Sequence, residues 1–377
     1  VWFTEFATVL MGRFRGGPAK VSVFASSIFG SISGSAVSNV VTTGVITIPL
    51  MRKGGYHAHL AGAIEAVAST GGQLMPPVMG AAAFLMAEFL AISYTEVILA
   101  ALIPAILYYV ALFIQADLEA ARSGIARIDK SLIPPAWTVI KSGWFFPLPF
   151  AVLLFALFWL NDLPEKAALR AVAMIVVLSL LFGFKGKRMK WFDIFDSLRT
   201  TGIAVLNIFM IGAAVGLVIG VLNLSGLGFA MTLSLVQIAG GNLIFLLVMA
   251  AVTCIILGMG MPTLGVYVLL ATLVAPALEE FGVLPISAHL FIQYFGMLSF
   301  ITPPVAIAAC AAATLNNADP MRTGFAAIRF GWLAFVIPFM FVLSPTLIMK
   351  GHPLLIIVDL ITALAGTWLV SVGMTGY

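Results

Sequence analysis

Two short segments of the chain combine helix-breaking residues with small side chains that carry oxygen atoms. Residues 30–39 hold two glycines, four serines and Asn39, and residues 258–263 hold two glycines, a proline and Thr263. Glycine and proline interrupt helices, and the freed carbonyl groups, with hydroxyl and amide oxygens beside them, can bind a cation at membrane depth. Both segments are therefore candidate sites for a cation such as sodium. Small residues also permit close helix packing, which is the alternative interpretation.

A second motif follows each of these segments at a similar distance. A proline pair occurs at 76–77 and again 227 positions later at 303–304, and a run of small residues follows each pair, at 80–83 and at 308–311. Because proline ends or bends a helix, each pair marks an interrupted helix. The chain is expected to contain two copies of one unit, which consists of a glycine-rich hairpin, an interrupted helix and a further helix.

The composition indicates what must hold these motifs in place. Of the 377 residues, 62% are hydrophobic and 9% are charged, with a mean hydropathy of +1.13, whereas a soluble domain has about 25% charged residues. Continuous apolar stretches such as 97–114 and 331–348 have the length of a membrane-spanning helix, about 17–25 residues. The sequence therefore predicts an all-α polytopic membrane protein embedded in a lipid bilayer. It excludes a soluble enzyme, and because the basic residues lie in short segments between spans, it also excludes a nucleic-acid partner.

The basic residues also indicate the topology, because Lys and Arg are enriched in cytoplasmic loops. They flank residues 21–51 on both sides, which predicts a re-entrant hairpin on the cytoplasmic side. Residues 258–278 are followed by two glutamates without a basic residue nearby, which predicts a hairpin that enters from outside. Seven spans are expected between the hairpins, with 227–239 and 243–257 as two of them. An odd number makes the two copies inverted repeats, and inverted repeats with interrupted helices in matching positions indicate a secondary transporter.

These features predict six parts of the chain. They are an N-terminal cytoplasmic segment (1–20), a first transport repeat (21–116) with its hairpin at 21–51 and interrupted helix at 58–89, a cytoplasmic linker (117–142), connecting scaffold helices (143–257), a second transport repeat (258–349) with its hairpin at 258–278 and interrupted helix at 288–315, and a C-terminal helix (350–377).

Glu65 is an acidic residue within an otherwise apolar segment. An acid at membrane depth is a functional candidate by default, and proton coupling and a purely structural partnership are both open for it. The sequence contains no HExxH or CxxC spacing and no Gly-x-Ser-x-Gly motif. It therefore predicts a transport protein that is not an enzyme, with no cofactor and no metal beyond a coupling ion.

Three runs, at 34–44, 69–80 and 258–263, resemble the large membrane subunit of TRAP transporters, and more narrowly the fused permeases that work with TAXI-type binding proteins. The resemblance implies an elevator-type importer in the bacterial inner membrane, driven by sodium, with protons as the alternative. It also implies a periplasmic TAXI-type binding protein, a small membrane subunit or a fused N-terminal equivalent, and a small organic acid as substrate. The chain is then expected to be a fragment that lacks the upstream small-subunit-like part.

The resemblance further implies that the ion sites lie at the two hairpin tips and the substrate between them. The first ion site is expected at Ser33, Ser35, Asn39, Thr70 and Gly72. The second is expected at Gly258, Gly260, Met261, Thr263 and Thr302. The substrate site is expected to include Ser35, Gly71, Pro76, Pro262, Thr263 and Pro303. Two other functions stay open, an ion-coupled carboxylate carrier without a binding protein and a passive channel.

Overall fold

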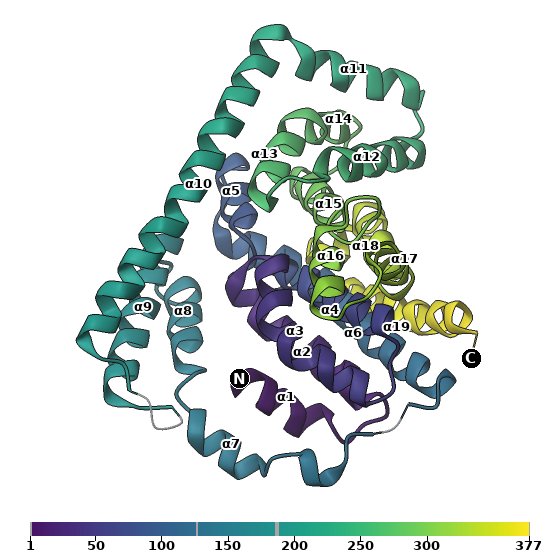
Figure 1. Cartoon of the computed structure of the whole chain (residues 1–377). Helices are drawn as coiled ribbons and strands as arrows, with labels where there is room; N and C mark the ends of the chain where they lie inside the picture. Colours follow the sequence, from purple (N-terminus) through teal and green to yellow (C-terminus); the bar gives the residue numbers. More distant parts are fainter. Residues whose placement is uncertain (1, 126, 185–187, 377) are drawn as a thin grey trace.

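The computed structural model describes residues 2–125, 127–184 and 188–376, and these residues fold into a set of packed helices (Figure 1). The first third of the chain forms a helix in the expected N-terminal segment, α1, and then the elements of the first expected repeat. In chain order these are α1 (Trp2–Met11), α2 (Gly17–Ser33), α3 (Ala36–Lys53), α4 (Ala58–Gly71), the short 3-10 helix η1 (Gly72–Leu74), α5 (Ala81–Phe89) and α6 (Tyr94–Arg122).

The middle of the chain forms η2 (Lys130–Leu132), α7 (Ala136–Gly143), α8 (Leu148–Phe158), α9 (Pro164–Leu181), the long α10 (Trp191–Ser225) and α11 (Leu227–Ala239). The remainder forms α12 (Leu243–Gly258), α13 (Thr263–Leu273), α14 (Ala275–Glu280), α15 (Pro285–Leu298), α16 (Ile307–Leu315), α17 (Pro320–Phe330), α18 (Trp332–Leu343), η3 (Pro345–Ile348) and α19 (Pro353–Thr375).

The first hairpin consists of α2 and α3, which lie side by side in Figure 1 and pack closely. Gly34 ends α2 in a left-handed conformation with φ of 58°, and its N–H donates to Gly30 O. Such a conformation is favourable for glycine because it has no Cβ. Ser35 then caps α3, since its hydroxyl oxygen accepts a hydrogen bond from Ser38 N. Two residues are thus enough to reverse the chain.

The second hairpin differs in its position from the sequence prediction. Its two arms are α12 and α13, and the chain turns between them at 259–262. Residue 258, where the sequence predicts that the hairpin begins, therefore lies next to the turn in the middle of the hairpin. The expected hairpin at 258–278 therefore contains only the second arm, continued by α14. Residues 243–257 were expected to form a complete span because they are continuously apolar. However, α12 has 16 residues, which rise about 24 Å, less than the about 30 Å of a bilayer core.

The reassignment of α12 changes the number of expected spans between the hairpins. The 13-residue α11 runs across one end of the long α10 in Figure 1, and α12 is part of a hairpin. Among the described residues between the hairpins, α6 and α10 are long and apolar enough to cross a membrane singly, and residues 130–143 with α8 meet this criterion together. The inverted orientation of the two repeats stays a prediction.

Both interrupted helices have the same layout. In each copy a 14-residue helix, α4 or α15, ends before the proline pair, and a 9-residue helix, α5 or α16, begins after it. The bonds Pro76–Pro77 and Pro303–Pro304 are both cis. The equal lengths on both sides of the break agree with an internal repeat.

The two copies exchange helices. Within each copy the hairpin packs on its own interrupted helix, as α2 and α3 on α4, and α12 and α13 on α15. Between copies, α3 packs on α16 of the second repeat, and α13 packs on α5 of the first. Because these two contacts correspond to each other, the repeats form one intertwined core.

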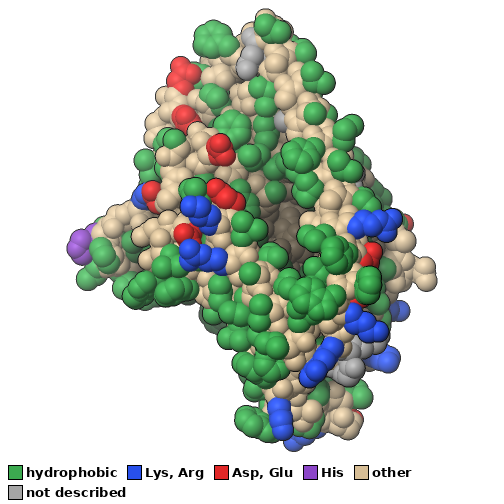
Figure 2. Space-filling model, turned by 90° about the vertical axis from the view of Figure 1, so that its left-hand side faces the viewer, with side chains coloured by type: hydrophobic (Ala, Val, Ile, Leu, Met, Phe, Trp, Pro, Cys, Tyr) green, Lys and Arg blue, Asp and Glu red, His purple; other side chains and the backbone are tan. Residues whose placement is uncertain are grey.

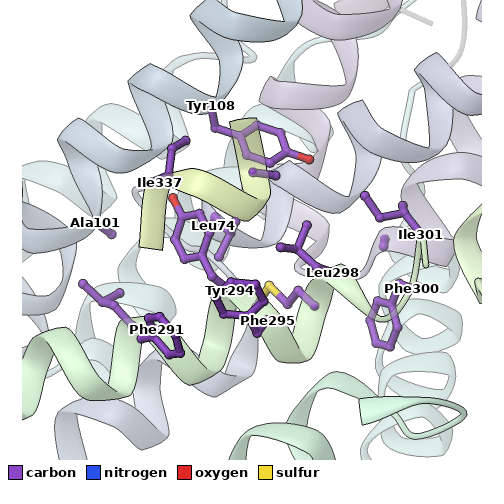
Figure 3. Packing of buried hydrophobic residues seen from close by; sticks show 14 of the residues in the cluster. Leu74, Ala101, Tyr108, Phe291, Tyr294, Phe295, Leu298, Phe300, Ile301 and Ile337 are labelled. Carbon is purple, nitrogen blue, oxygen red and sulfur yellow. The ribbon is translucent and has the colours of Figure 1, made fainter. Parts of the chain in front are cut away.

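Figure 3 shows the centre of this core. Leu74 of η1 and Tyr108 of α6 come from the first repeat, while Tyr294 of α15 and Ile337 of α18 come from the second, and all four are at most 2% exposed. Because lipid tails are as apolar as these side chains, close van der Waals packing between the side chains holds the helices together within a membrane. The elements of both repeats are therefore held against each other by one common hydrophobic cluster.

Three helices among the described residues are long and apolar enough to cross a membrane singly, namely α6, α10 over residues 191–222, and α19. Two bent pairs meet the same criterion together, residues 130–143 with α8 at 61° and α17 with α18 at 43°. No described residue in the apolar window of α10 is buried, as expected for a helix with a side that faces lipid, although Ile219 and Leu222 pack in part against the core. In the space-filling view, Lys and Arg extend to the lower end of the molecule and Asp and Glu lie higher (Figure 2).

The close approach of the first hairpin to α4 yields a stability prediction. A methyl group at Gly30 would lie 2.5 Å from Gly72 Cα, so Gly30→Ala should push the hairpin from the broken helix and destabilise the protein by about 1–3 kcal/mol. Gly212→Ala is the matched control, because nothing lies within 4 Å of a methyl group there. Thermal unfolding of the purified protein in detergent should show a lower midpoint for Gly30→Ala only. Equal midpoints would contradict the observed contact.

Candidate functional site

The first candidate ion site centres on Asn39, which is fully buried between the hairpin and α4. Its Nδ2 donates to Ser26 O at 2.9 Å and to Ser69 O at 3.4 Å, so the amide joins both arms of the hairpin to the broken helix. Carbonyl groups accept hydrogen bonds, so the side of the Asn39 amide that faces Ser26 O and Ser69 O must be its nitrogen. The amide oxygen, Oδ1, faces away from them and accepts a hydrogen bond from Thr43 Oγ1 at 3.1 Å. The structure also brings Asn39 next to Gly72, as the sequence predicts, because a methyl group at Gly72 would lie 3.2 Å from Asn39 Nδ2.

The two serines expected in this site lie at the hairpin turn. The turn packs on the segment after the first proline pair, since a methyl group at Gly34 would lie 2.8 Å from Met79 O. Ser35 caps α3, while the buried hydroxyl of Ser33 has no hydrogen-bond partner among the described residues. Thr70 is fully buried one turn below the break, where its hydroxyl donates to Ala66 O at 2.8 Å. Ser33 and Thr70 thus keep oxygen lone pairs that a cation could use.

The second candidate site has the corresponding arrangement with fewer side-chain oxygens. A methyl group at Gly258 would lie 2.9 Å from Ser299 Oγ, so this turn also touches the break of its own repeat. Thr302 lies one turn further on and donates to Leu298 O at 2.7 Å. Gly260 has a φ of 81° and nothing within 4 Å of a Cβ position, so the tip, with Met261 beside it, is open.

Gln73 connects the two candidate sites and is absent from the residues that the sequence predicts. Its Oε1 accepts a hydrogen bond from Thr263 Oγ1 at 3.1 Å, which joins the break of the first repeat to the tip of the second hairpin. Gln73 is 1% exposed, and its Nε2 has no partner among the described residues. The sequence does contain a signal for Gln73, which is a difference between the two copies. Gln73 is polar, whereas Phe300, the corresponding residue of the second copy, is apolar.

Of the residues expected around the substrate, Gly71 and Pro262 adjoin the two ends of this bridge, whereas Pro76 lines an apolar cavity beside Trp144 and Pro303 packs against Gly324 of α17. Gly71 packs directly against the Tyr108 ring, which would meet a methyl group there at 2.2 Å. Pro262 is the N-terminal cap of α13 and precedes Thr263. The two proline pairs, with Pro76 and Pro303, are in the breaks of α4 and α15. The bridge from Gln73 to Thr263 is the direct hydrogen bond that brings the two halves of this set together.

Glu65 is fully buried and lies in α4, where it faces the hairpin. Five hydroxyl groups surround its carboxyl group: those of Ser22 and Ser26 on α2, Thr43 and Thr47 on α3, and Ser69 on α4. Ser22 lies at 2.6 Å from Oε2 and Ser26 at 3.0 Å from Oε1. Among the described residues it forms no ion pair. Sequence reasoning singled out this acid but not the hydroxyl groups, because they come from three different helices.

Paired hairpins and broken helices that meet in the interior are features of secondary transporters, a class of membrane transport proteins. The comparison with protein families agrees with this class. Residues 2–353 match the family described as tripartite ATP-independent periplasmic transporter, DctM component. The chain belongs to this family, which is one of transport permeases and not of enzymes.

The individual relatives share 24–30% sequence identity with the chain over the aligned segments. The chain is 30% identical over 220 residues to an uncharacterised protein of Sinorhizobium fredii, covering 57% of this chain and 51% of that protein. It is 24% identical over 306 residues to the 2,3-diketo-L-gulonate TRAP transporter large permease protein YiaN of Escherichia coli, covering 78% and 68%. It is also 24% identical over 337 residues to the sialic acid TRAP transporter permease protein SiaT of Haemophilus influenzae, covering 89% and 52%. The chain thus spans 51–68% of the length of these relatives.

The first site yields a prediction for two of its residues. Asn39→Ala or Thr70→Ala each removes an oxygen from the tip, so the sodium concentration that gives half-maximal uptake should rise about tenfold. Thr367→Ala is the matched control for Thr70, because Thr367 is also buried and also donates to the carbonyl four residues earlier, but it lies on α19. Uptake into vesicles at varied sodium concentrations measures the effect. An unchanged ion dependence in both variants would remove these residues from the site.

Proposed function

We propose that this chain is the membrane permease of a tripartite, binding-protein-dependent secondary transporter that imports small carboxylate-bearing solutes. The observation that carries the proposal is the Gln73–Thr263 hydrogen bond, which joins the break of one repeat to the hairpin tip of the other. Membership of the permease family supports it, as do the substrates after which two relatives are named, sialic acid and 2,3-diketo-L-gulonate. The permease acts in the bacterial inner membrane and receives its solute from a periplasmic binding protein of the TAXI type.

The helix ends around the breaks suit an anionic solute. Helices α3, α5, α13 and α16 all begin at a hairpin tip or just after a proline pair. The N-terminus of a helix carries a partial positive charge and free N–H groups. Neither tip, at 30–39 or 258–263, contains Lys or Arg. A solute carboxylate between the tips would therefore be met by helix dipoles, the hydroxyl groups of Ser35 and Thr263, and the free amide of Gln73.

Sodium is the proposed coupling ion. Each tip and the helix break beside it offer backbone carbonyl groups and neutral side-chain oxygens. These oxygens belong to Ser33, Asn39 and Thr70 in the first repeat and to Thr263 and Thr302 in the second. Hard monovalent and divalent cations are bound by such oxygens in proteins. Gly258, Gly260 and Gly72 would contribute through their backbone. Met261 would line the second tip, where its carbonyl oxygen would be the atom that binds the cation.

The proposed movement is of the elevator type, in which the intertwined repeats slide against the helices around them. Two apolar cavities of about 580 Å³ and 350 Å³ separate the first repeat from α7–α9. Ile28 and Pro76 line the first cavity on the side of the repeat, and Trp144 and Phe150 line it on the other. A smooth, loosely packed apolar boundary has few hydrogen bonds to break during sliding. A small membrane subunit or its fused equivalent would complete this outer part.

Transport by the reconstituted system tests the proposal. The full-length permease in proteoliposomes, with its binding protein and a solute of the carboxylate class outside, should take up solute only when a sodium gradient is present. A proton gradient in place of sodium is the second arm, and omission of the binding protein is the third. Saturable uptake that needs both the binding protein and a cation gradient is the expected result. Uptake that ignores both gradients would contradict coupled transport, and non-saturable flux without the binding protein would indicate a channel.

A further inference from the structure

The hydroxyl groups around Glu65 form a continuous path to the first candidate ion site. Thr43 Oγ1 is within hydrogen-bond distance of Glu65 Oε1 and, at 3.1 Å, of Asn39 Oδ1; it also lies 2.7 Å from Asn39 O. Ser26 and Ser69 also contact both residues, but their backbone carbonyl groups, not their hydroxyls, accept the hydrogen bonds from Asn39 Nδ2. Among the described residues, Thr43 supplies the one hydroxyl group that lies within hydrogen-bond distance of both the Glu65 carboxyl group and Asn39 Oδ1. The inference below rests on the proposed role of Asn39 as an ion ligand.

The hydroxyl groups around Glu65 lie at hydrogen-bond distances from its carboxyl group. Its carboxyl oxygens lie 2.6 Å from Ser22 Oγ, 3.0 Å from Ser26 Oγ and 3.2 Å from Ser69 Oγ. Direct contacts of this length are those of hydrogen bonds, so the network is spaced to hold a proton on the carboxyl group.

A threonine hydroxyl has one proton, so Thr43 can donate to one acceptor at a time. When Glu65 is ionised, Thr43 donates to Glu65 Oε1, and Asn39 Oδ1 keeps its lone pairs for a cation. When Glu65 carries a proton, its own O–H donates to Thr43 Oγ1, and Thr43 donates to Asn39 instead. The ionised state also leaves a negative charge that attracts a cation in the low-dielectric interior.

We propose that a proton on Glu65 and a cation at the tip of the first hairpin exclude one another, with Thr43 as the link. Glu65 is thus a positioning residue for the ion site, and cation binding releases one proton from Glu65 to the solution. The exchange keeps the total charge of the buried network constant, which avoids the high cost of an additional uncompensated charge inside the membrane. By linkage, acid must weaken cation binding as much as the cation lowers the proton affinity.

Other titratable groups on the helices around α4 have partners of their own. Lys20 pairs with Asp117, Arg329 with Glu119, and Glu96 with Lys350. Backbone carbonyl groups accept hydrogen bonds from Arg52, Arg122, Tyr108 and Tyr109. On α6, the Tyr94 hydroxyl donates to backbone carbonyl groups of Pro77 and Val78. The remaining groups on these helices and on α4 itself are Lys53, Cys310, Arg322 and His59, for which the structure gives no hydrogen bond or ion pair with Glu65. In the described part of the chain, Glu65 is the titratable group joined to Asn39.

The test uses sodium itself as the probe. The purified permease is unfolded by heat in sodium chloride or potassium chloride at constant ionic strength, between pH 5.5 and 8.5, and the sodium concentration for half of the stabilisation is recorded. In the wild type this concentration should rise towards low pH, by up to about tenfold per pH unit. Glu65→Gln should raise it at high pH and make it independent of pH.

Two isosteric variants separate the proposed link from a structural role. Thr43→Val removes the hydroxyl between Glu65 and Asn39 and should abolish the pH dependence of sodium binding. Thr47→Val removes another hydroxyl group that donates to the Glu65 carboxyl group. This hydroxyl group has no hydrogen bond with Asn39, so the variant should retain the pH dependence. A wild-type sodium affinity that is equal across the pH range, or equal behaviour of the two variants, would overturn the inference.

Failure of the inference can be distinguished from failure of the proposed function. Sodium-specific stabilisation that is lost in Asn39→Ala but does not respond to pH or to Glu65→Gln would leave the ion site intact and refute the exchange with Glu65. Absence of any sodium-specific stabilisation in the wild type would refute the sodium site, and the exchange with it.

Discussion

A helix that breaks inside a membrane must have its freed backbone groups satisfied by protein, because no water is available there. In this chain the turn of each hairpin packs directly against the break of its own repeat. The contact is close enough that Gly30 and Gly72 cannot carry a side chain, and the same holds for Gly258 against Ser299. The requirement that stabilises the breaks therefore also places carbonyl, hydroxyl and amide oxygens together, and the candidate ion sites follow from it.

The exchange of helices makes the two repeats depend on each other. Helix α3 packs on α16 and α13 on α5, so each repeat provides part of the packing surface of the other. The same exchange brings Gln73 to Thr263. The common core makes the two breaks one central region, and this region is where a solute can touch both repeats at once.

The two repeats have similar shapes but different chemistry. Glu65 with its five hydroxyl groups belongs to the first repeat, and Ile292 stands at the equivalent position of the second. The first tip also has more serine residues than the second. The repeated fold thus provides two candidate ion sites, and only the first of them lies beside a buried acid.

The sequence by itself determined the membrane class, the two glycine-rich turns and the two broken helices, because helix-breaking residues and long apolar runs act through local backbone geometry and hydrophobicity. It also pointed to Asn39 and Glu65. It did not determine that Leu243–Gly258 is the first arm of a hairpin, since a buried arm and a membrane span are equally apolar. Only the tertiary structure showed the bridge from Gln73 to Thr263 and the hydroxyl groups around Glu65. These contacts join residues up to 190 positions apart, and packing between helices, not local spacing, decides which of them meet.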